Sequence, residues 1–216
     1  MANKEEKLLI GIDNAARCPV IGSISMALVA VDTNFFRRFS WLPIKDSKTL
    51  TPIQINKVVD CTRKHLKDFA CLYIKPEQID ADNLNDLECQ AIIELLNKIY
   101  RFWKHSIFID NFDPSKEKFI ERFNRLLPQN LRVLNALKGE NLDLDKWTII
   151  HECDANHKVC SLASIYAKYY STIEYNDIKA VWGDFGSGNP GDPKTLQFIK
   201  EHPDCPHIRE SWVKSG

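Results

Sequence analysis

The sequence LLIGIDNAARCPVIGSISMALVAVD, residues 8–32, is where the strand signal of the chain begins. It contains two apolar runs, LLIGID (8–13) and SISMALVAVD (23–32), which flank a turn from Pro19 to Gly22. A short apolar run bounded by turn residues is typical of a strand buried inside a sheet. We therefore expect two strands here, the first of which ends at Asp13.

Strands and helices are expected to alternate along the rest of the chain. The predicted strands are ACLYIK (70–75), SIFID (106–110), LRVLNAL (131–137) and TIIHECD (148–154). The predicted helices begin at Thr51–Pro52, at a capping box of Asn85 and Glu88, at Asp113–Pro114 (114–127), near 161 (to about 181) and at Asp192–Pro193. This alternation predicts an α/β layered fold, and no linker divides it, so we expect a single domain over 1–216.

The composition is that of a soluble globular protein. The chain has 216 residues, 29 acidic and 29 basic residues, and 44% hydrophobic content. No run approaches the roughly 20 apolar residues that a membrane-spanning helix needs, and MANKEEKLLI does not resemble a signal peptide. Seven scattered cysteines without a CxxC indicate reduced thiols, so we expect a cytoplasmic protein. Because the net charge is zero, binding to phosphates would require a local basic patch or a metal.

Three aspartates end apolar runs, namely Asp13, Asp110 and Asp154. Strand ends are where open α/β sheets place their ligands. Carboxylates gathered there would repel one another unless a hard cation such as Mg²⁺ or Mn²⁺ lay between them. A single aspartate after a strand is ordinary turn chemistry, so it is their joint placement that favours a metal site.

Six sequence blocks, taken together, resemble a known enzyme family. They are GIDNAARCPVIG (11–22), KDSKTL (45–50), FIDNFD (108–113), DANHKVCSLASIYAK (154–168), GDFGSGNPGDPKT (183–195) and IRESW (208–212). In this order they are similar to ribonuclease HII (ribonuclease H type 2), in its archaeal and eukaryotic catalytic-subunit form. The resemblance implies a ribonuclease H-like mixed sheet flanked by helices, with extra C-terminal helices.

The resemblance also implies a reaction. In the family, four carboxylates hold two divalent ions, Mg²⁺ or Mn²⁺, and the enzyme hydrolyses the RNA strand of RNA/DNA hybrids. Asp13, Asp110 and Asp154 match three of the four positions, whereas Asn14 stands where the family has glutamate. An asparagine offers one neutral carbonyl oxygen on a shorter arm, so it neutralises less metal charge.

On the substrate side, the resemblance implies contacts by a second set of residues. They are Arg17, Cys18, Lys45, Ser47, Lys48, Ser164, Lys168 and Asn189, and the four cations Arg17, Lys45, Lys48 and Lys168 could form a phosphate-binding patch. Several positions depart from the family. Ala16–Arg17–Cys18 replaces Gly-Arg-Gly, Asn189 replaces a tyrosine that senses the RNA–DNA junction, and Ser171–Thr172 and His157–Lys158 also differ. Side chains in place of glycines obstruct a close approach of the backbone to the substrate.

Two compensating sites come into question. Glu152 precedes Asp154 by two residues, so in an extended strand both side chains would point to one face, roughly 6–7 Å apart, and Glu152 could supply the missing carboxylate. The alternative is an exposed surface glutamate. His151, Cys153, His157 and Cys160 could be zinc ligands, but their spacing is not a standard one.

Two functions from different classes remain open. The first is a metal-dependent ribonuclease, weakened by Asn14 and poor at excising single ribonucleotides from DNA. The second is an inactive descendant that binds RNA/DNA hybrid or a protein partner on the same fold. In either case we expect a monomer without a membrane association.

Overall fold

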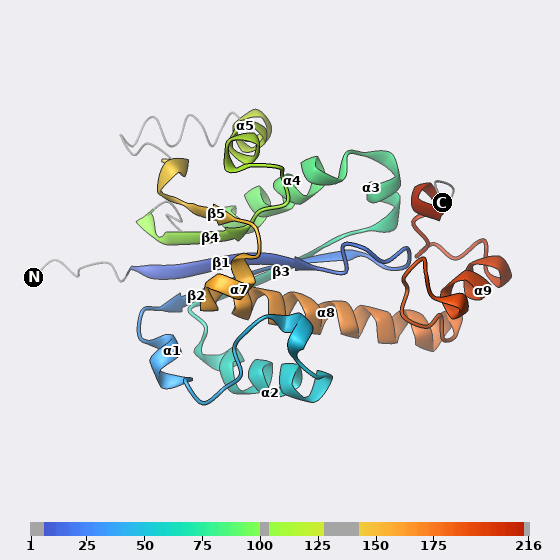
Figure 1. Ribbon diagram of the computed structural model, residues 1–216, viewed down its shortest axis with the longest axis horizontal. Helices are drawn as coiled ribbons and strands as arrows, with labels where there is room; N and C mark the ends of the chain where they lie inside the picture. The colour runs from blue at the N-terminus through green and yellow to red at the C-terminus, as the bar shows by residue number, and fades with distance from the viewer. Residues whose placement is uncertain (1–6, 100–103, 128–142, 214–216) are drawn as a thin grey trace, which may run out of the picture.

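The central element is strand β1, around which a five-stranded sheet is built (Figure 1). The computed structural model describes residues 7–99, 104–127 and 143–213. The strand order is β3-β2-β1-β4-β5. The strands are β1 (Leu8–Ala15), β2 (Ile24–Asp32), β3 (Asp68–Ile74), β4 (Ser106–Asp110) and β5 (Thr148–Ile150). β2 is antiparallel to β1 and to β3, while β4 is parallel to β1 and to β5, so the sheet is mixed as expected.

Helices cover both faces of this sheet. In Figure 1, α3 (Pro76–Ala81), α4 (Leu84–Asn97) and α5 (Lys116–Leu126) lie above it, and α1 (Phe35–Arg38), α2 (Pro52–Thr62) and α8 (Lys158–Trp182) lie below it. Every residue of β2 is buried. A strand covered on both faces has no polar face to present, which explains why its sequence is apolar except at Ser25 and at Asp32, where it ends.

Short elements join these layers, and further helices lie at the C-terminal end. They are the 3₁₀ turns η1 (Ser47–Thr49), η2 (Arg63–His65) and η4 (Leu144–Lys146), and the helices α7 (Cys153–Asn156), α9 (Pro193–Glu201) and α10 (Glu210–Val213). No helix in the described ranges is long and apolar enough to cross a bilayer.

Most expected elements are present, with shifted ends. The helix at Thr51–Pro52 has its capping box, with Thr51 and Gln54 bonded reciprocally. The capping box of Asn85 and Glu88 is wrong, because Asn83 caps α4 by accepting from the N–H of Asp86. Asn85 and Glu88 both lie inside that helix. The helix expected at Asp113–Pro114 begins instead after Ser115, whose side chain caps α5.

The strand expected over 148–154 is also only partly present. β5 ends at Ile150, and Glu152 adopts a left-handed backbone conformation with φ 54°. This conformation breaks the extended strand, so Asp154 lies on the short helix α7 rather than at a strand end. α8 then begins at Lys158, earlier than expected. The predicted strand 131–137 lies outside the described residues.

Helix α8 packs unusually close to β1 at Gly11. A β-carbon at this position would lie 2.2 Å from the carbonyl oxygen of Val159 and 3.0 Å from the backbone nitrogen of Cys160. Both are backbone atoms near the start of α8, and they cannot move without shifting the helix. Glycine is therefore required at position 11 for the helix to lie at this distance.

The connection from β1 to β2 is fixed by a buried arginine from the C-terminal end. Arg209 is fully buried and donates to the carbonyl oxygens of Gly22 (2.8 Å), Arg17 (3.1 Å) and Ala16 (2.8 Å). Within the connection, Ala16 has φ 62°, in the left-handed region. A non-glycine residue pays a steric cost there that glycine does not.

Replacing Gly11 with alanine should lower the free energy of unfolding by about 3 kcal/mol, at the upper end of the over-packing range, because the added β-carbon meets helix backbone. Urea denaturation followed by circular dichroism measures the change. Gly191→Ala is the matched control, since nothing lies within 4 Å of a β-carbon built there. Equal stability of the two variants would contradict the close packing.

Replacing Ala16 with glycine should raise the free energy of unfolding. The left-handed conformation costs alanine about 1–2 kcal/mol, and the greater chain entropy of glycine cancels about 0.5–1 kcal/mol of the relief, which leaves a net gain of up to about 1.5 kcal/mol. Ala81→Gly, at the end of helix α3, should change stability in the opposite direction. Denaturation of both variants side by side provides the measurement, and a loss of stability in Ala16→Gly would refute this account.

Candidate active site

Asp13, Asp110 and Asp154 come together from three elements. β1 and β4 are neighbouring parallel strands with Ile12 opposite Ile109, so the aspartates that follow each of these residues lie side by side. The backbone N–H of Cys153 donates to Oδ1 of Asp110 at 2.8 Å, which fixes the start of α7, and with it Asp154, beside β4. Asp13 and Asp154 are buried, with 5% and 6% of their surface exposed.

Burial and neighbouring negative charges both disfavour the ionised forms of these carboxylates. Burial raises the pKa of Asp13 well above its usual value, and the negative charges of Asp110 and Asp154 raise it further. Burial and Asp154 likewise raise the pKa of Asp110, against an opposing hydrogen bond from Cys153 and the charge of Lys48. The pKa of Asp154 is raised by burial and by Asp46. Bringing a divalent cation here would relieve both the burial penalty and the mutual repulsion.

The three carboxylates are donors of the type that such a cation prefers, but they are not arranged together as a metal-binding group. Anionic oxygen donors are the ligands that Mg²⁺ and Mn²⁺ prefer. Among the residues that the structure describes, however, no group of three or more His, Cys, Asp or Glu side chains is placed to hold a metal ion together. The donor chemistry therefore fits a divalent ion, and the carboxylates would have to draw closer to bind it.

The KDSK block lies against the same cluster. Ser47, on η1, shares a hydrogen bond with Ser164 of α8 at 2.9 Å between the two Oγ atoms, and Ser164 also donates to Asp154 Oδ2 at 3.5 Å. Nζ of Lys168 donates to the carbonyl oxygen of Ser47 at 3.5 Å. Lys48 is exposed and close enough to lower the pKa of both Asp110 and Asp154.

Other expected substrate-side residues lie on the surface. Lys45 and Cys18 are exposed. Asn189 is exposed on the loop before α9, where its Nδ2 donates to Oγ of Ser187 at 3.4 Å. This loop is joined to the β1–β2 connection by a bond from the N–H of Val20 to the carbonyl oxygen of Gly188 at 2.7 Å.

The basis for Glu152 as a substitute carboxylate is absent. Because Glu152 is exposed and left-handed, it does not share the face of an extended strand with Asp154. The four residues considered as zinc ligands also do not gather at one place. Cys153 and Cys160 lie with their sulfur atoms 2.6 Å apart, while the ring of His157 packs against Phe108, with the centroids 4.9 Å apart, and His151 is exposed.

Asn14 contacts Glu88, a carboxylate that the sequence pattern assigned to a helix cap and not to the site. Its Nδ2 donates to Oε1 of Glu88 at 3.2 Å. Successive residues of a strand point to opposite faces, so Asp13 lies near Ser164 of α8 whereas Asn14 lies against α4. The signal for Glu88 was a charged residue among the apolar positions of an amphipathic helix, beside Leu87, Ala91 and Ile92, but it also fitted a capping box.

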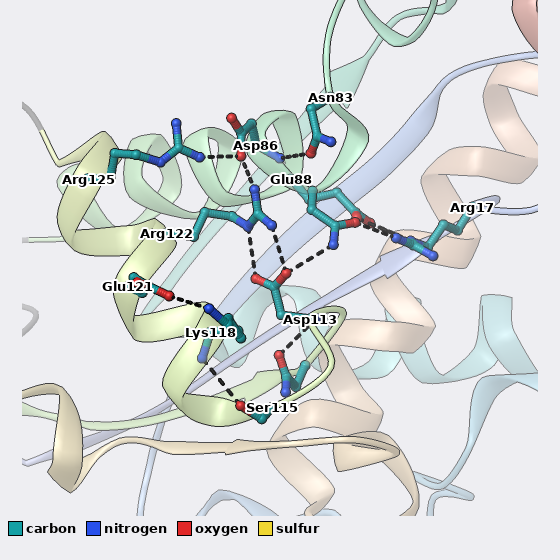
Figure 2. A network of polar contacts seen from close by, with 12 residues as sticks. Arg17, Asn83, Asp86, Glu88, Asp113, Ser115, Lys118, Glu121, Arg122 and Arg125 are labelled. Atoms are coloured by element: carbon teal, nitrogen blue, oxygen red, sulfur yellow. Dashed lines mark hydrogen bonds and ion pairs between the residues drawn. The ribbon is translucent and has the colours of Figure 1, made fainter.

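Glu88 also binds Arg17, and Figure 2 shows the network that extends from this pair. Nε of Arg17 lies 3.2 Å from Oε1 and 3.1 Å from Oε2 of Glu88. Nη2 of Arg17 donates to Oδ1 of Asn85 at 2.8 Å. Burial raises the pKa of Glu88 to about 7, although the charge of Arg17 opposes the rise, and Asp113 and Asp110 add to it.

Comparisons with known proteins show which family this chain is similar to. A family model described as Ribonuclease HII matches residues 10–214. The Ribonuclease HII of Pyrococcus abyssi (strain GE5 / Orsay) is 33% identical over 209 residues, which cover 94% of this chain and 87% of the relative.

Solved structures agree. The ribonuclease H2 from Pyrococcus horikoshii OT3 matches with a TM-score of 0.78 and 28% identity over 96% of each chain. A chain from the PCNA:RNase HII complex of Archaeoglobus fulgidus matches with a TM-score of 0.74 and 26% identity over 95% of each chain. The mixed sheet flanked by helices is thus the ribonuclease H-like fold expected from the sequence. Given a family model that spans nearly the whole chain and a relative of this identity, the chain belongs to the ribonuclease HII family.

Proposed function

We propose that this chain is a metal-dependent endonuclease that hydrolyses the RNA strand of RNA/DNA hybrids. The observation that carries the proposal is the convergence of Asp13, Asp110 and Asp154 from β1, β4 and α7 into one electrostatically coupled cluster. By the resemblance of the sequence blocks, they stand at the positions of metal-binding carboxylates in the family to which the chain belongs. A structural role alone would not favour buried carboxylates in which Asp154 raises the pKa of both Asp13 and Asp110.

The aspartates would hold Mg²⁺ or Mn²⁺ in this proposal. When bound, two such ions activate a water molecule and stabilise the leaving oxygen of an in-line displacement. The Ser164 hydroxyl lies between the two carboxylates: it donates to Asp154 and is close enough to Asp13 to lower its pKa. Lys48 places a positive charge next to the cluster, where a phosphate of the RNA strand would lie, and Lys168 holds η1 in place through the carbonyl oxygen of Ser47.

Activity is expected to be weak. Asn14 contributes no negative charge, and its amide nitrogen is engaged by Glu88, so only one neutral oxygen remains for a metal. Recognition of a single ribonucleotide should be poor as well, because Ala16 and Cys18 carry β-carbons where the family has glycines, and Asn189 offers no ring. We therefore propose that longer RNA tracts are the preferred substrate.

A second candidate is a non-cleaving module that binds hybrid or a protein partner. The observation that favours it is that the described carboxylates do not close around a metal position, with Asn14 in place of a fourth. The assay that follows separates it from the nuclease.

Purified protein should cleave an RNA/DNA hybrid in Mg²⁺ or Mn²⁺, and should cleave a duplex with one embedded ribonucleotide more slowly. Asp110→Asn should reduce the rate by more than about 100-fold, beyond the range for residues that only support metal ligands. Asp60→Asn, an exposed aspartate of α2, is the matched control and should keep the native rate. If the native chain is inert in both metals yet shifts the hybrid in a gel, the nuclease is excluded and the binding module is supported.

Replacing Asn14 with glutamate should increase cleavage by on the order of tenfold at limiting metal, because the new carboxylate adds negative charge to the metal site. Initial rates measured across a Mn²⁺ titration test this, and the gain should shrink at saturating metal. Asn97→Glu adds the same charge on the exposed end of α4 and should have no effect. A rate that is equally low in Asn14→Glu at every metal concentration would show that the missing carboxylate does not limit activity.

A further inference from the structure

Glu88 is a buried carboxylate on the apolar side of α4. Its side chain is 0% exposed, among buried residues such as Leu87, Ala91 and Ile92. Taking a carboxylate out of water costs several kcal/mol, and an apolar side chain of similar size is often at least as good for stability. The groups that Glu88 binds therefore indicate what it does besides stabilising the fold.

Those groups belong to the end of β1 and the residues just after it. Glu88 accepts from Nε of Arg17 with both oxygens, and from Nδ2 of Asn14 with one. The side chain of Arg17 is 39% exposed, in contrast to that of Glu88. The guanidinium is thus anchored from the protein interior while part of it faces solvent.

A second anchor holds the same guanidinium. Oδ1 of Asn85 accepts from Nη2 of Arg17 at 2.8 Å, and Nδ2 of Asn85 donates to Oδ1 of Asp113 at 3.0 Å. Asp113 is itself bound by Arg122 of α5, with contacts of 2.9 Å to each oxygen (Figure 2). Because Asp113 can only accept, it orients the amide of Asn85 so that the carbonyl oxygen faces Arg17.

These anchors leave part of the guanidinium for a ligand. Nε and Nη2 are engaged, whereas Nη1 has no hydrogen-bond partner within the described ranges. A guanidinium that presents fixed N–H donors to solvent is suited to a phosphate oxygen. Arg17 follows β1 closely, three residues after Asn14 and four after Asp13, so such a phosphate would lie near the aspartate cluster.

We propose that Glu88 and Asn85 are positioning residues, which hold Arg17 in a fixed orientation for a backbone phosphate of the RNA/DNA hybrid. This inference rests on the proposed function and names the residues that prepare one contact of that site. An exposed arginine loses up to about 2 kcal/mol of side-chain entropy when it is immobilised. Fixing the guanidinium before binding removes this cost from the binding step.

Binding of a fluorescein-labelled RNA/DNA hybrid, followed by fluorescence anisotropy in EDTA, tests the proposal without any need for cleavage. Glu88→Gln and Asn85→Ala should each weaken the hybrid affinity by about three- to tenfold, as expected for coupled contacts. The double variant Glu88→Gln/Arg17→Ala should bind no more weakly than Arg17→Ala alone, because Glu88 acts through Arg17. Glu94→Gln, an exposed position on the same helix, is the matched control.

Three results would overturn the proposal. They are unchanged affinity in both Glu88→Gln and Asn85→Ala, additive losses in the double variant, or tighter binding in Glu88→Gln, which would mean that Glu88 merely repels phosphate. Thermal denaturation of each variant identifies a loss of fold, and Asn85→Ala keeps the buried carboxylate should Glu88→Gln unfold.

The outcome also separates this inference from the proposed nuclease. A native chain that binds hybrid without cleaving it refutes the nuclease, and the affinity series still decides the role of Glu88. If the chain cleaves, Asn85→Ala, which does not touch Asn14, should raise KM while leaving kcat nearly unchanged, since the contact is made to the bound strand. A native chain that binds no hybrid overturns both.

Discussion

Helix α8 packs against β1 at Gly11 with no space for a side chain, and the positions of several site residues follow from this contact. A β-carbon there would sit 2.2 Å from the carbonyl oxygen of Val159, so no other residue permits this distance. Because α8 lies this near, Ser164 reaches Asp13 and Asp154, and Ser47 of η1 docks onto Ser164. α7 directly precedes α8, so the same contact also fixes where Asp154 can lie. One glycine two residues before Asp13 thus sets how α7 and α8, and with them Asp154 and Ser164, lie relative to Asp13.

The two faces of β1 give their buried carboxylates different partners, although burial raises the pKa on both faces. Toward α8, Asp13 has only hydrogen bonds to offset its burial, and neighbouring aspartates raise its pKa further. Toward α4, Glu88 is matched by the guanidinium of Arg17. A carboxylate with its cation built in is a structural anchor, whereas one without a cation requires charge from outside. The equal numbers of acids and bases in the sequence conceal this division, because the balance is local and differs from one face to the other.

The sequence predicted the sheet better than it predicted the site. Apolar runs marked β1, β2 and β4, because strands covered on both faces have continuous apolar sequences, and this also located Asp13 and Asp110. The sequence predicts that Asp154 ends a strand, because a left-handed backbone conformation has no recognisable sequence signature at a glutamate such as Glu152. Asn85 and Glu88 fitted a capping box equally well. Their true partner, Arg17, lies some 70 residues earlier, and a local pattern carries no information about contacts at such a separation.

The amide at position 14 suits the α4 side of β1 for a physical reason. Asn14 donates to Glu88, so an amide N–H faces a carboxylate oxygen. A glutamate at that position would set a second carboxylate beside Glu88, with the single guanidinium of Arg17 to neutralise both. Unless a metal ion binds beside them, like charges at this distance in a buried setting favour protonation of one of them. Asparagine therefore adds no negative charge at the metal site. Its amide N–H instead satisfies the buried carboxylate of Glu88, which also holds Arg17. The departure from the family at position 14 and the anchoring of the guanidinium are in this way two consequences of one contact.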